Sequence, residues 1–190
     1  MQTTPVVPAP LARTAGITLI ELMVTLAIVA IVAALGVPSF LRAIARHAIA
    51  SQAEELQDAV RLGRNEAMKR SGPVVLCRTE PDNTSRCAGT GGNWQTWLLF
   101  SDTGRTGSFA AGDAIVRQHL DVSNRMTVTG KAASVRFEST GIAHADVDGV
   151  VFTLSPAGAS SGAGDRALQR QVCVNPRGEV AVIEGGATCP

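Results

Sequence analysis

One apolar stretch near the N-terminus, Ile17–Val37, constrains this chain more than any other feature of its sequence. Seventeen of its 21 residues are aliphatic, Met or Ala, and Glu21 is its one charged residue. As a helix it would be roughly 30 Å long, which is the thickness of a bilayer's hydrocarbon core. Residues 1–16 precede it with Arg13 as their one charged side chain. Positive-inside reasoning therefore predicts that residues 1–16 are cytoplasmic and that the chain after Val37 is outside.

Three interpretations of this stretch compete. A cleavable secretory signal would place small residues such as Ala33, Ala34 and Gly36 near the cut. Its apolar core is normally 7–15 residues long, so this stretch exceeds it. A plain membrane anchor fits the length but leaves Glu21 unexplained, because a carboxylate costs up to about 3 kcal/mol inside a bilayer. A third interpretation explains the acid as well.

Residues 15–22, AGITLIEL, closely resemble the cleavage signal of type IV prepilins. The resemblance implies that a prepilin peptidase at the inner membrane cuts between Gly16 and Ile17 and then methylates the new amine. Glu21 becomes the fifth residue of the mature chain, where pilins carry a characteristic Glu. In a filament its carboxylate would neutralise the buried amine of a neighbouring subunit, and this pairing would set the register. Pro38 matches a Pro that is frequent in pilins, where the helix can bend or melt during assembly.

The sequence from residue 39 to about residue 70 predicts that the helix continues. Apolar residues recur there at spacings of three, four or seven, as in an amphipathic helix: Ile49, Ala53, Leu56, Val60 and Ala67. Gly63 on this helix suggests close packing against a sheet. Residues 71–73, Ser-Gly-Pro, are expected to stop the helix.

After residue 73 the sequence changes to short apolar segments separated by turns rich in Gly, Asp and Ser, which predicts strands. Residues 156–165 (PAGASSGAGD) have the composition of a flexible loop. The expected strands are Val74–Arg78, Trp94–Ser101, Ala114–His119, Met126–Thr129, Ser134–Phe137, Val150–Ser155, Arg170–Asn175 and Val180–Glu184.

Several segments of this second half resemble the FimT/GspH group of minor pilins and pseudopilins. They are residues 63–67 (GRNEA), 74–77 (VVLC), 99–102 (LFSD), 113–117 (DAIVR), 135–141 and 170–178. The resemblance implies an α+β fold, with a long N-terminal helix, transmembrane and then amphipathic, packed on a C-terminal domain of two antiparallel β-sheets. The expected organisation is a leader at 1–16, a transmembrane assembly helix at 17–38, an amphipathic stem at 39–72 and a periplasmic β domain at 73–190.

The four cysteines, Cys77, Cys87, Cys173 and Cys189, allow three disulfide pairings, and the sequence does not choose among them. Pairing nearest neighbours would join Cys77 to Cys87 and Cys173 to Cys189. Such disulfides require an oxidising compartment. A zinc site is disfavoured because no C-x-x-C occurs and the three histidines are distant in sequence.

No catalytic constellation is evident, and we expect neither an enzyme nor a cofactor or metal. Asp102 and Asp113 lie in turn-rich segments, so they are expected to form turns rather than to hold a cation. His119 on a candidate strand is expected to be structural or on the surface. Trp94 and Trp97 are three residues apart and would face opposite sides of one strand, which predicts one core residue and one surface residue.

Binding to DNA is a minority hypothesis. Some FimT proteins bind DNA through a C-terminal Gly-Arg-x-Arg, whereas residues 178–181 here read Gly-Glu-Val-Ala. Arg166, Arg170 and Arg177 would have to supply the phosphate contacts instead. The net charge of +1 and the 4% aromatic content provide little general attraction for nucleic acid.

The sequence therefore predicts a minor pilin of the type IV pilus system. Its partners would be prepilin peptidase, other minor and major pilins and the bacterial inner membrane. It would cross that membrane once before it joins a filament. The alternatives are an H-type pseudopilin of type II secretion, which shares fold, processing and motifs, and a DNA-binding pilin of natural transformation.

Overall fold

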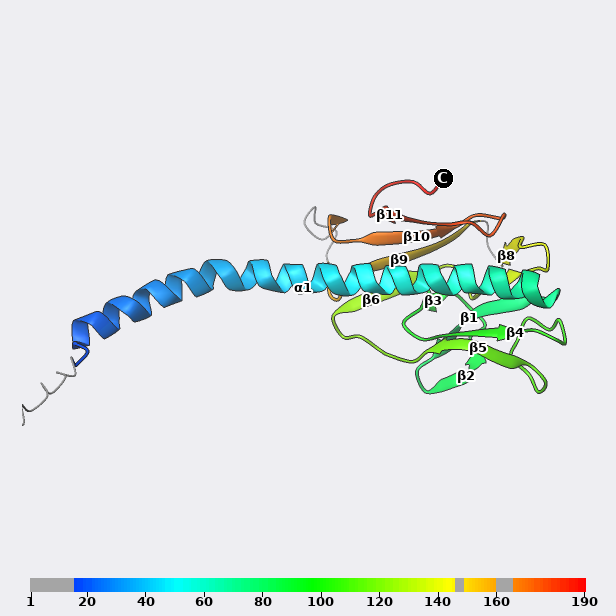
Figure 1. Ribbon diagram of the computed structural model, residues 1–190, viewed down its shortest axis with the longest axis horizontal. Helices are drawn as coiled ribbons and strands as arrows, with labels where there is room; N and C mark the ends of the chain where they lie inside the picture. The colour runs from blue at the N-terminus through cyan, green and yellow to red at the C-terminus, as the bar shows by residue number, and fades with distance from the viewer. Residues whose placement is uncertain (1–15, 146–148, 160–165) are drawn as a thin grey trace, which may run out of the picture. The chain divides into compact units, whose positions relative to one another are not determined.

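Helix α1 (Leu19–Arg70) is one continuous element, and the β-strands follow it along the chain (Figure 1). The computed structural model describes residues 16–145, 149–159 and 166–190. The expected leader up to residue 15 and part of the loop expected at 156–165 lie outside the described residues, as does the side chain of residue 38. The chain divides into two units, Met1–Leu41 and Arg42–Pro190. The second unit contains the C-terminal part of α1 and both sheets.

The predicted apolar stripe of α1 is confirmed. Ile49, Ala53, Leu56, Val60 and Ala67 are each at most 1% exposed. The helix ends at Arg70, as the Ser-Gly-Pro sequence predicted. Ser71 has a φ of 52°, and the amide of Gly72 donates to the carbonyl of Ala67 at 3.2 Å. The left-handed residue of this helix end is therefore Ser71, and Gly72 supplies the closing hydrogen bond.

Two antiparallel sheets pack on α1 (Figure 1). The first has the order β5-β4-β1-β7-β8, with β2 paired to β1, and the second has the order β11-β10-β9-β6-β3. Strands of the first sheet are β1 (Val74–Glu80), β2 (Asn83–Cys87), β4 (Trp97–Ser101), β5 (Ala114–His119), β7 (Ser134–Phe137) and β8 (Ala143–Ala145). Strands of the second are β3 (Gly92–Asn93), β6 (Met126–Gly130), β9 (Val150–Pro156), β10 (Arg170–Val174) and β11 (Val180–Glu184).

The main core lies between the stripe of α1 and the inner faces of both sheets. Leu99 and Phe137 from the first sheet and Phe152 and Val172 from the second are fully buried in it. Alternate residues of β1 and β4 point to the outer face of the first sheet and form a second apolar cluster there. It consists of Val75, Cys77, Leu98 and Phe100, with Cys87 and Phe109 packed against it. Both faces of β1 are thus buried over residues 74–77, which explains the continuous apolar sequence VVLC there.

The prediction that one of the two tryptophans lies on the surface is wrong, because Trp94 and Trp97 are both fully buried. The chain crosses from one sheet to the other between them. The amide of Trp94 donates to the carbonyl of Val128 in the second sheet, whereas the carbonyl of Thr96 accepts from Thr79 in the first. The expected single strand at 94–101 is therefore only β4, and the alternation of faces restarts after the crossing.

Three strands were not expected from the sequence. Strand β2 is polar (NTSRC) and pairs only with β1, to which the Cys77–Cys87 disulfide also ties it. Strands β3 and β8 have two and three residues, which is too short for any alternation to show. Pairing with β1, β6 and β7 creates β2, β3 and β8 respectively, so their own sequences do not reveal them.

Candidate assembly interface

The first part of α1 presents an unbroken apolar surface. The large hydrophobic side chains from Ile17 to Leu41 are between 51% and 76% exposed within this chain. By length and composition α1 contains a candidate membrane span. Folded proteins rarely leave an apolar surface of this extent in water, so a membrane or other helices must cover it.

The N-terminus of α1 is capped by a residue that the sequence analysis did not single out. The amide of Glu21 donates to Thr18 Oγ1 at 3.3 Å, and the amide of Leu22 donates to the Thr18 carbonyl at 3.1 Å. Thr18 is thus the N-cap, and Glu21 occupies the third helical position, as in the capping-box pattern T-x-x-E. That pattern was visible in the sequence and could have identified Thr18.

The carboxylate of Glu21 is exposed and forms no ion pair with any residue in the described part of the chain. Its place in the first turn of α1 is favourable for a negative charge, because the helix dipole is positive there. Gly16 and Ile17, the residues flanking the expected cut, are exposed and precede the helix. Helix α1 continues through residue 38 without interruption.

An ion-pair cluster connects the edge strand β5 to α1. His119 Nδ1 lies 2.9 Å from Glu55 Oε1, and Arg117 Nη2 lies 3.4 Å from the same oxygen. The His119 ring stacks on Trp97, with 5.7 Å between ring centroids. His119 therefore has a structural role in fixing β5 against α1. Nothing in the local sequence around Glu55 indicates this partner, which is 64 residues away.

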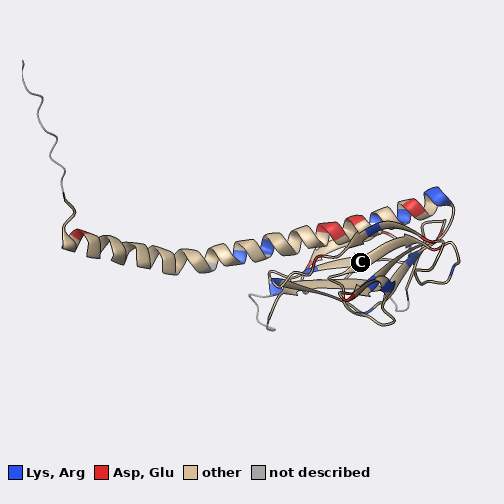
Figure 2. Cartoon of the chain, turned by 90° about the horizontal axis from the view of Figure 1, so that it is seen from below, with Lys and Arg blue, Asp and Glu red and all other residues tan. Residues whose placement is uncertain are grey.

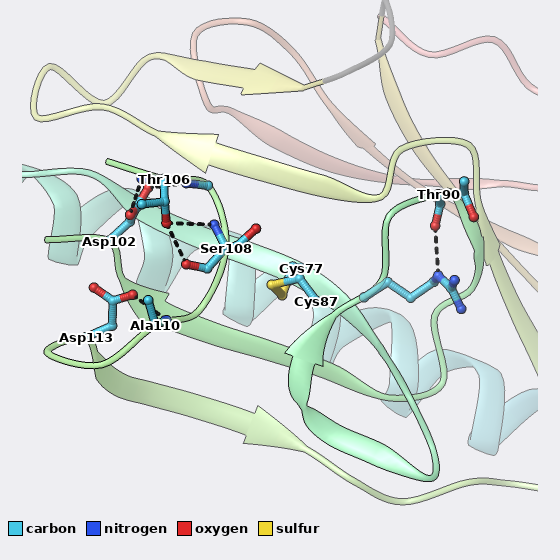
Figure 3. Close-up of a disulfide and its surroundings, with 10 residues drawn as sticks. Cys77, Cys87, Thr90, Asp102, Thr106, Ser108, Ala110 and Asp113 are labelled. Carbon is cyan, nitrogen blue, oxygen red and sulfur yellow. Dashed lines mark hydrogen bonds between the residues drawn. A yellow bond between two sulfur atoms is a disulfide. The ribbon is translucent and has the colours of Figure 1, made fainter. Parts of the chain in front are cut away.

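The disulfide between Cys77 and Cys87 lies on the outer face of the first sheet, near the loop between β4 and β5 (Figure 3). The second disulfide joins Cys173 to Cys189 and attaches the C-terminal segment to β10. These are the nearest-neighbour pairs that the spacing suggested. The first one helps to cover the outer cluster of the sheet, together with Phe109.

Two aspartates organise the β4–β5 loop (Figure 3). The fully buried carboxylate of Asp102 accepts from the amides of Thr106 and Gly107, both at 2.9 Å, and from Arg136 Nη2 at 2.8 Å. It is thus surrounded by donors from the chain itself.

The second aspartate, Asp113, accepts from the Thr103 hydroxyl at 2.8 Å and from the amides of Thr103 and Ala110, both at 2.9 Å. Burial raises the pKa of Asp113, but these hydrogen bonds outweigh burial, so its pKa lies below the ordinary value. Each aspartate thus has its own set of donors, and both serve as turn formers, as the sequence indicated.

The three arginines considered for DNA binding do not form one surface. Arg166 precedes β10 and Arg170 begins it, whereas Arg177 lies in the turn between β10 and β11. These positions are separated by the length of β10, roughly 15 Å for five residues. Arg170 is also engaged, because its Nη2 lies 3.5 Å from Glu184 Oε1.

The turn at residues 178–181, where the sequence analysis looked for a Gly-Arg-x-Arg, is packed against α1. Gly178 has a φ of 72°, and a Cβ there would overlap the carbonyl of Gly141 and contact Arg64. The following residue, Glu179, accepts a hydrogen bond from Asn175 Nδ2 at 2.7 Å. An acidic side chain held in this way does not supply a phosphate contact.

Comparisons with known proteins agree with this architecture. The profile of the family described as Type II transport protein GspH matches residues 52–178, and that of the Prokaryotic N-terminal methylation motif matches residues 11–37. The fold is similar to the type IV minor pilin FimU of Pseudomonas aeruginosa strain PAO1 (space group P21). The TM-score is 0.50 and the identity 17%, over 75% of this chain and 92% of that one.

The fold is also similar to the minor pseudopilin EpsH from the Type 2 Secretion System of Vibrio cholerae. That TM-score is 0.49 and the identity 14%, over 73% of this chain and 98% of that one. No curated protein matches the sequence.

An exposed apolar helix with a single acid near its start, continued by a stem that packs on two antiparallel sheets, defines a type IV pilin-like protein. The GspH profile covers two thirds of the sequence, 127 of 190 residues. The chain belongs to the GspH family of minor pilins and pseudopilins.

Proposed function

We propose that this protein is a minor pilin of the type IV pilus system. A prepilin peptidase cuts it between Gly16 and Ile17 and methylates the new amine. The mature chain is held in the bacterial inner membrane by residues 17–38, with its β domain in the periplasm. It then joins other minor and major pilins through α1, where it primes or tips the filament.

The single observation that carries this proposal is the apolar surface of α1 from Ile17 to Leu41. Each large side chain in it contributes about 1.5–3 kcal/mol when it is removed from water. Fifteen such side chains are exposed within this chain, so covering them contributes on the order of 20–40 kcal/mol. A bilayer before assembly and a bundle of neighbouring helices after it would both supply this cover.

In this proposal Glu21 selects the register. Its carboxylate has no partner among the described residues and would be costly in an apolar bundle unless it met a positive charge. The methylated amine of Ile17 in a neighbouring subunit supplies that charge. Thr18 caps the helix through its hydroxyl, so the start of the helix and the charge of Glu21 can be tested separately.

Three variants test the proposal in the producing bacterium. Glu21→Gln removes the charge and keeps the Thr18 cap, whereas Thr18→Ala removes the cap and keeps the charge. We expect both to be cut before Ile17, as N-terminal sequencing would show, and only Glu21→Gln to be absent from sheared filaments. A large residue at Gly16 should leave an uncut precursor. Filaments containing normal amounts of Glu21→Gln would refute the register role, and normal cutting of the Gly16 variant would refute the cleavage site.

A second candidate function is that of an H-type pseudopilin in type II secretion, and the description of the matching family favours it. Deletion of the gene separates the two. Loss of surface pili with normal protein secretion supports the pilus role, whereas retained secreted enzymes inside the cell with normal pili support the secretion role. Co-purification with pilus minor pilins or with secretion pseudopilins would give the same distinction at the level of partners.

A further inference from the structure

Two arginines follow the apolar part of α1 directly along the chain. Arg42 and Arg46 are exposed, and neither forms an ion pair with another described residue. Each lies seven residues before a buried stripe residue, Ile49 and Ala53 respectively, and residues seven apart share a helix face. The arginines therefore extend the face on which the β-sheets pack, at the end of the unit 42–190 where α1 enters it.

The β5–β6 connection at this end exposes two apolar side chains, Leu120 at 46% and Val122 at 49%. Its backbone is held by the chain itself. His119 Nδ1 contacts Glu55 of α1 at 2.9 Å, and His119 Nε2 lies 3.2 Å from the carbonyl of Asp121. The apolar pair is thus presented by an anchored loop.

More basic residues belong to the same end. Arg125 is exposed immediately before β6, and its carbonyl accepts from the amide of Ala157 at 2.9 Å. Strand β10 begins at this end as well. Its first residue, Arg170, pairs with Leu154, which lies close to the end of β9. Arg166, four residues before Arg170, is therefore nearby in the chain. Figure 1 shows the β5–β6 connection at this end, and Figure 2 shows basic residues on the entering part of α1.

We define the basal surface as Arg42, Arg46, Leu120, Val122, Arg125 and Arg166. Its described acidic neighbours are few. Asp121 lies between the two apolar residues, Glu55 is held by His119 and Arg117, and Glu184 faces Arg170 at 3.5 Å. An exposed apolar pair beside cations in excess has the composition of a surface that docks on an anionic bilayer.

We propose that the basal surface binds the headgroups of anionic phospholipids while the protein is in the membrane. This inference rests on the proposed function, which places residues 17–38 in the bilayer. Arg42 comes one residue after the last exposed apolar side chain of that part of α1, Leu41, so along the helix it reaches the level of the lipid phosphates. A guanidinium group binds a phosphate through two parallel hydrogen bonds, and the arginine stem remains in contact with the acyl chains.

Leu120 and Val122 insert between headgroups in this arrangement. The β domain therefore rests on the membrane surface before assembly, and entry into a filament requires the lipid contacts to be broken. Anionic lipid is favoured over a protein partner because these arginines form no ion pair with any described residue, and Arg42 and Arg46 adjoin the membrane segment in the chain. Contact with a second copy of the chain is one outcome of the test.

Fluorescence quenching of the full-length protein tests the insertion. Val122→Trp places a reporter in the basal surface, and Ile142→Trp places a matched reporter at a half-exposed apolar site in the β7–β8 connection, at the opposite end of the sheets. Trp94 and Trp97 are fully buried and give a constant background. In vesicles of phosphatidylethanolamine and phosphatidylglycerol with brominated acyl chains, we expect quenching of Val122→Trp and none of Ile142→Trp.

The charge requirement is tested with spin-labelled lipids around the reconstituted full-length protein. The preference for phosphatidylglycerol over phosphatidylcholine should fall about fivefold for each arginine removed in Arg42→Gln and Arg46→Gln, since each cation contributes about 1 kcal/mol. Arg177→Gln, at the opposite end of β10, should leave the preference unchanged. High salt should reduce the preference of the unmodified protein.

The outcomes separate this inference from the proposed function. A protein that fails to insert into vesicles at all would contradict the proposed function. A protein that inserts but shows equal quenching of both reporters, or an unchanged lipid preference in Arg42→Gln/Arg46→Gln, would overturn the basal surface alone. If Val122→Trp fluorescence follows the protein-to-lipid ratio and not the brominated lipid, the surface contacts another copy and the lipid assignment is wrong.

Discussion

Replacing Gly63 with alanine tests how closely α1 packs on the first sheet. A Cβ at Gly63 would lie 2.9 Å from two ring carbons of Phe137 and 3.0 Å from Leu99 Cδ1. Both neighbours are fully buried, so the added methyl group has no open space to occupy. The close packing that this glycine suggested in the sequence is therefore present.

Two contributions of opposite sign decide how Gly63→Ala changes the free energy of unfolding. Alanine in place of a helical glycine contributes about 1 kcal/mol to stability. Overpacking a filled core costs about 1–3 kcal/mol. Because the Phe137 ring and the Leu99 methyl group meet the same added atom, we expect the second effect to exceed the first. Gly63→Ala should lower the free energy of unfolding by about 1 kcal/mol.

A double-mutant cycle with Phe137→Leu isolates the contact. The smaller side chain opens space opposite Gly63, so Gly63→Ala in that background should raise the free energy of unfolding by up to about 1 kcal/mol. Urea denaturation of residues 42–190, followed by the fluorescence of Trp94 and Trp97, measures all four proteins. If Gly63→Ala stabilises both backgrounds equally, the helix–sheet contact does not exist as described.

Three further predictions concern the β domain. Removing the Cys173–Cys189 disulfide, which closes 16 residues, should lower the free energy of unfolding in urea by about 3 kcal/mol; an unchanged midpoint would contradict this. Because the folded-state pKa of Asp113 is lowered, its contribution to the free energy of unfolding is full above its ordinary pKa and is lost as the pH falls from that value through the lowered one, so Asp113→Asn should flatten the acid limb of a stability–pH curve. An equally steep limb in the variant would argue against this. Arg177→Ala should leave any low-salt gel shift of duplex DNA by residues 42–190 unchanged, since Arg177 lies at the opposite end of β10 from Arg166; a shift abolished by Arg177→Ala alone would be the opposing result.

The helix and the general architecture were accessible from local patterns. The apolar run at residues 17–37, the stripe from Ile49 to Ala67 and the stop at residues 71–73 depend on neighbours within one or two helical turns. The N-cap residue Thr18 was also predictable from local sequence, because its capping pattern with Glu21 spans only three residues. The polar strand β2 and the short strands β3 and β8 were missed, since their pairing partners, and not their own residues, create them.

The sequence alone was thus sufficient to predict the long helix, its apolar N-terminal part with Glu21, and most of the strands in their order along the chain. Periodicity and turn residues act over short distances, so these features depend on local sequence. Only the folded chain determined that Trp94 and Trp97 share one core, that Glu55 holds His119, and that Arg166 and Arg177 lie apart. These relations depend on which distant segments pair, and pairing is decided by the packing of two sheets against one helix.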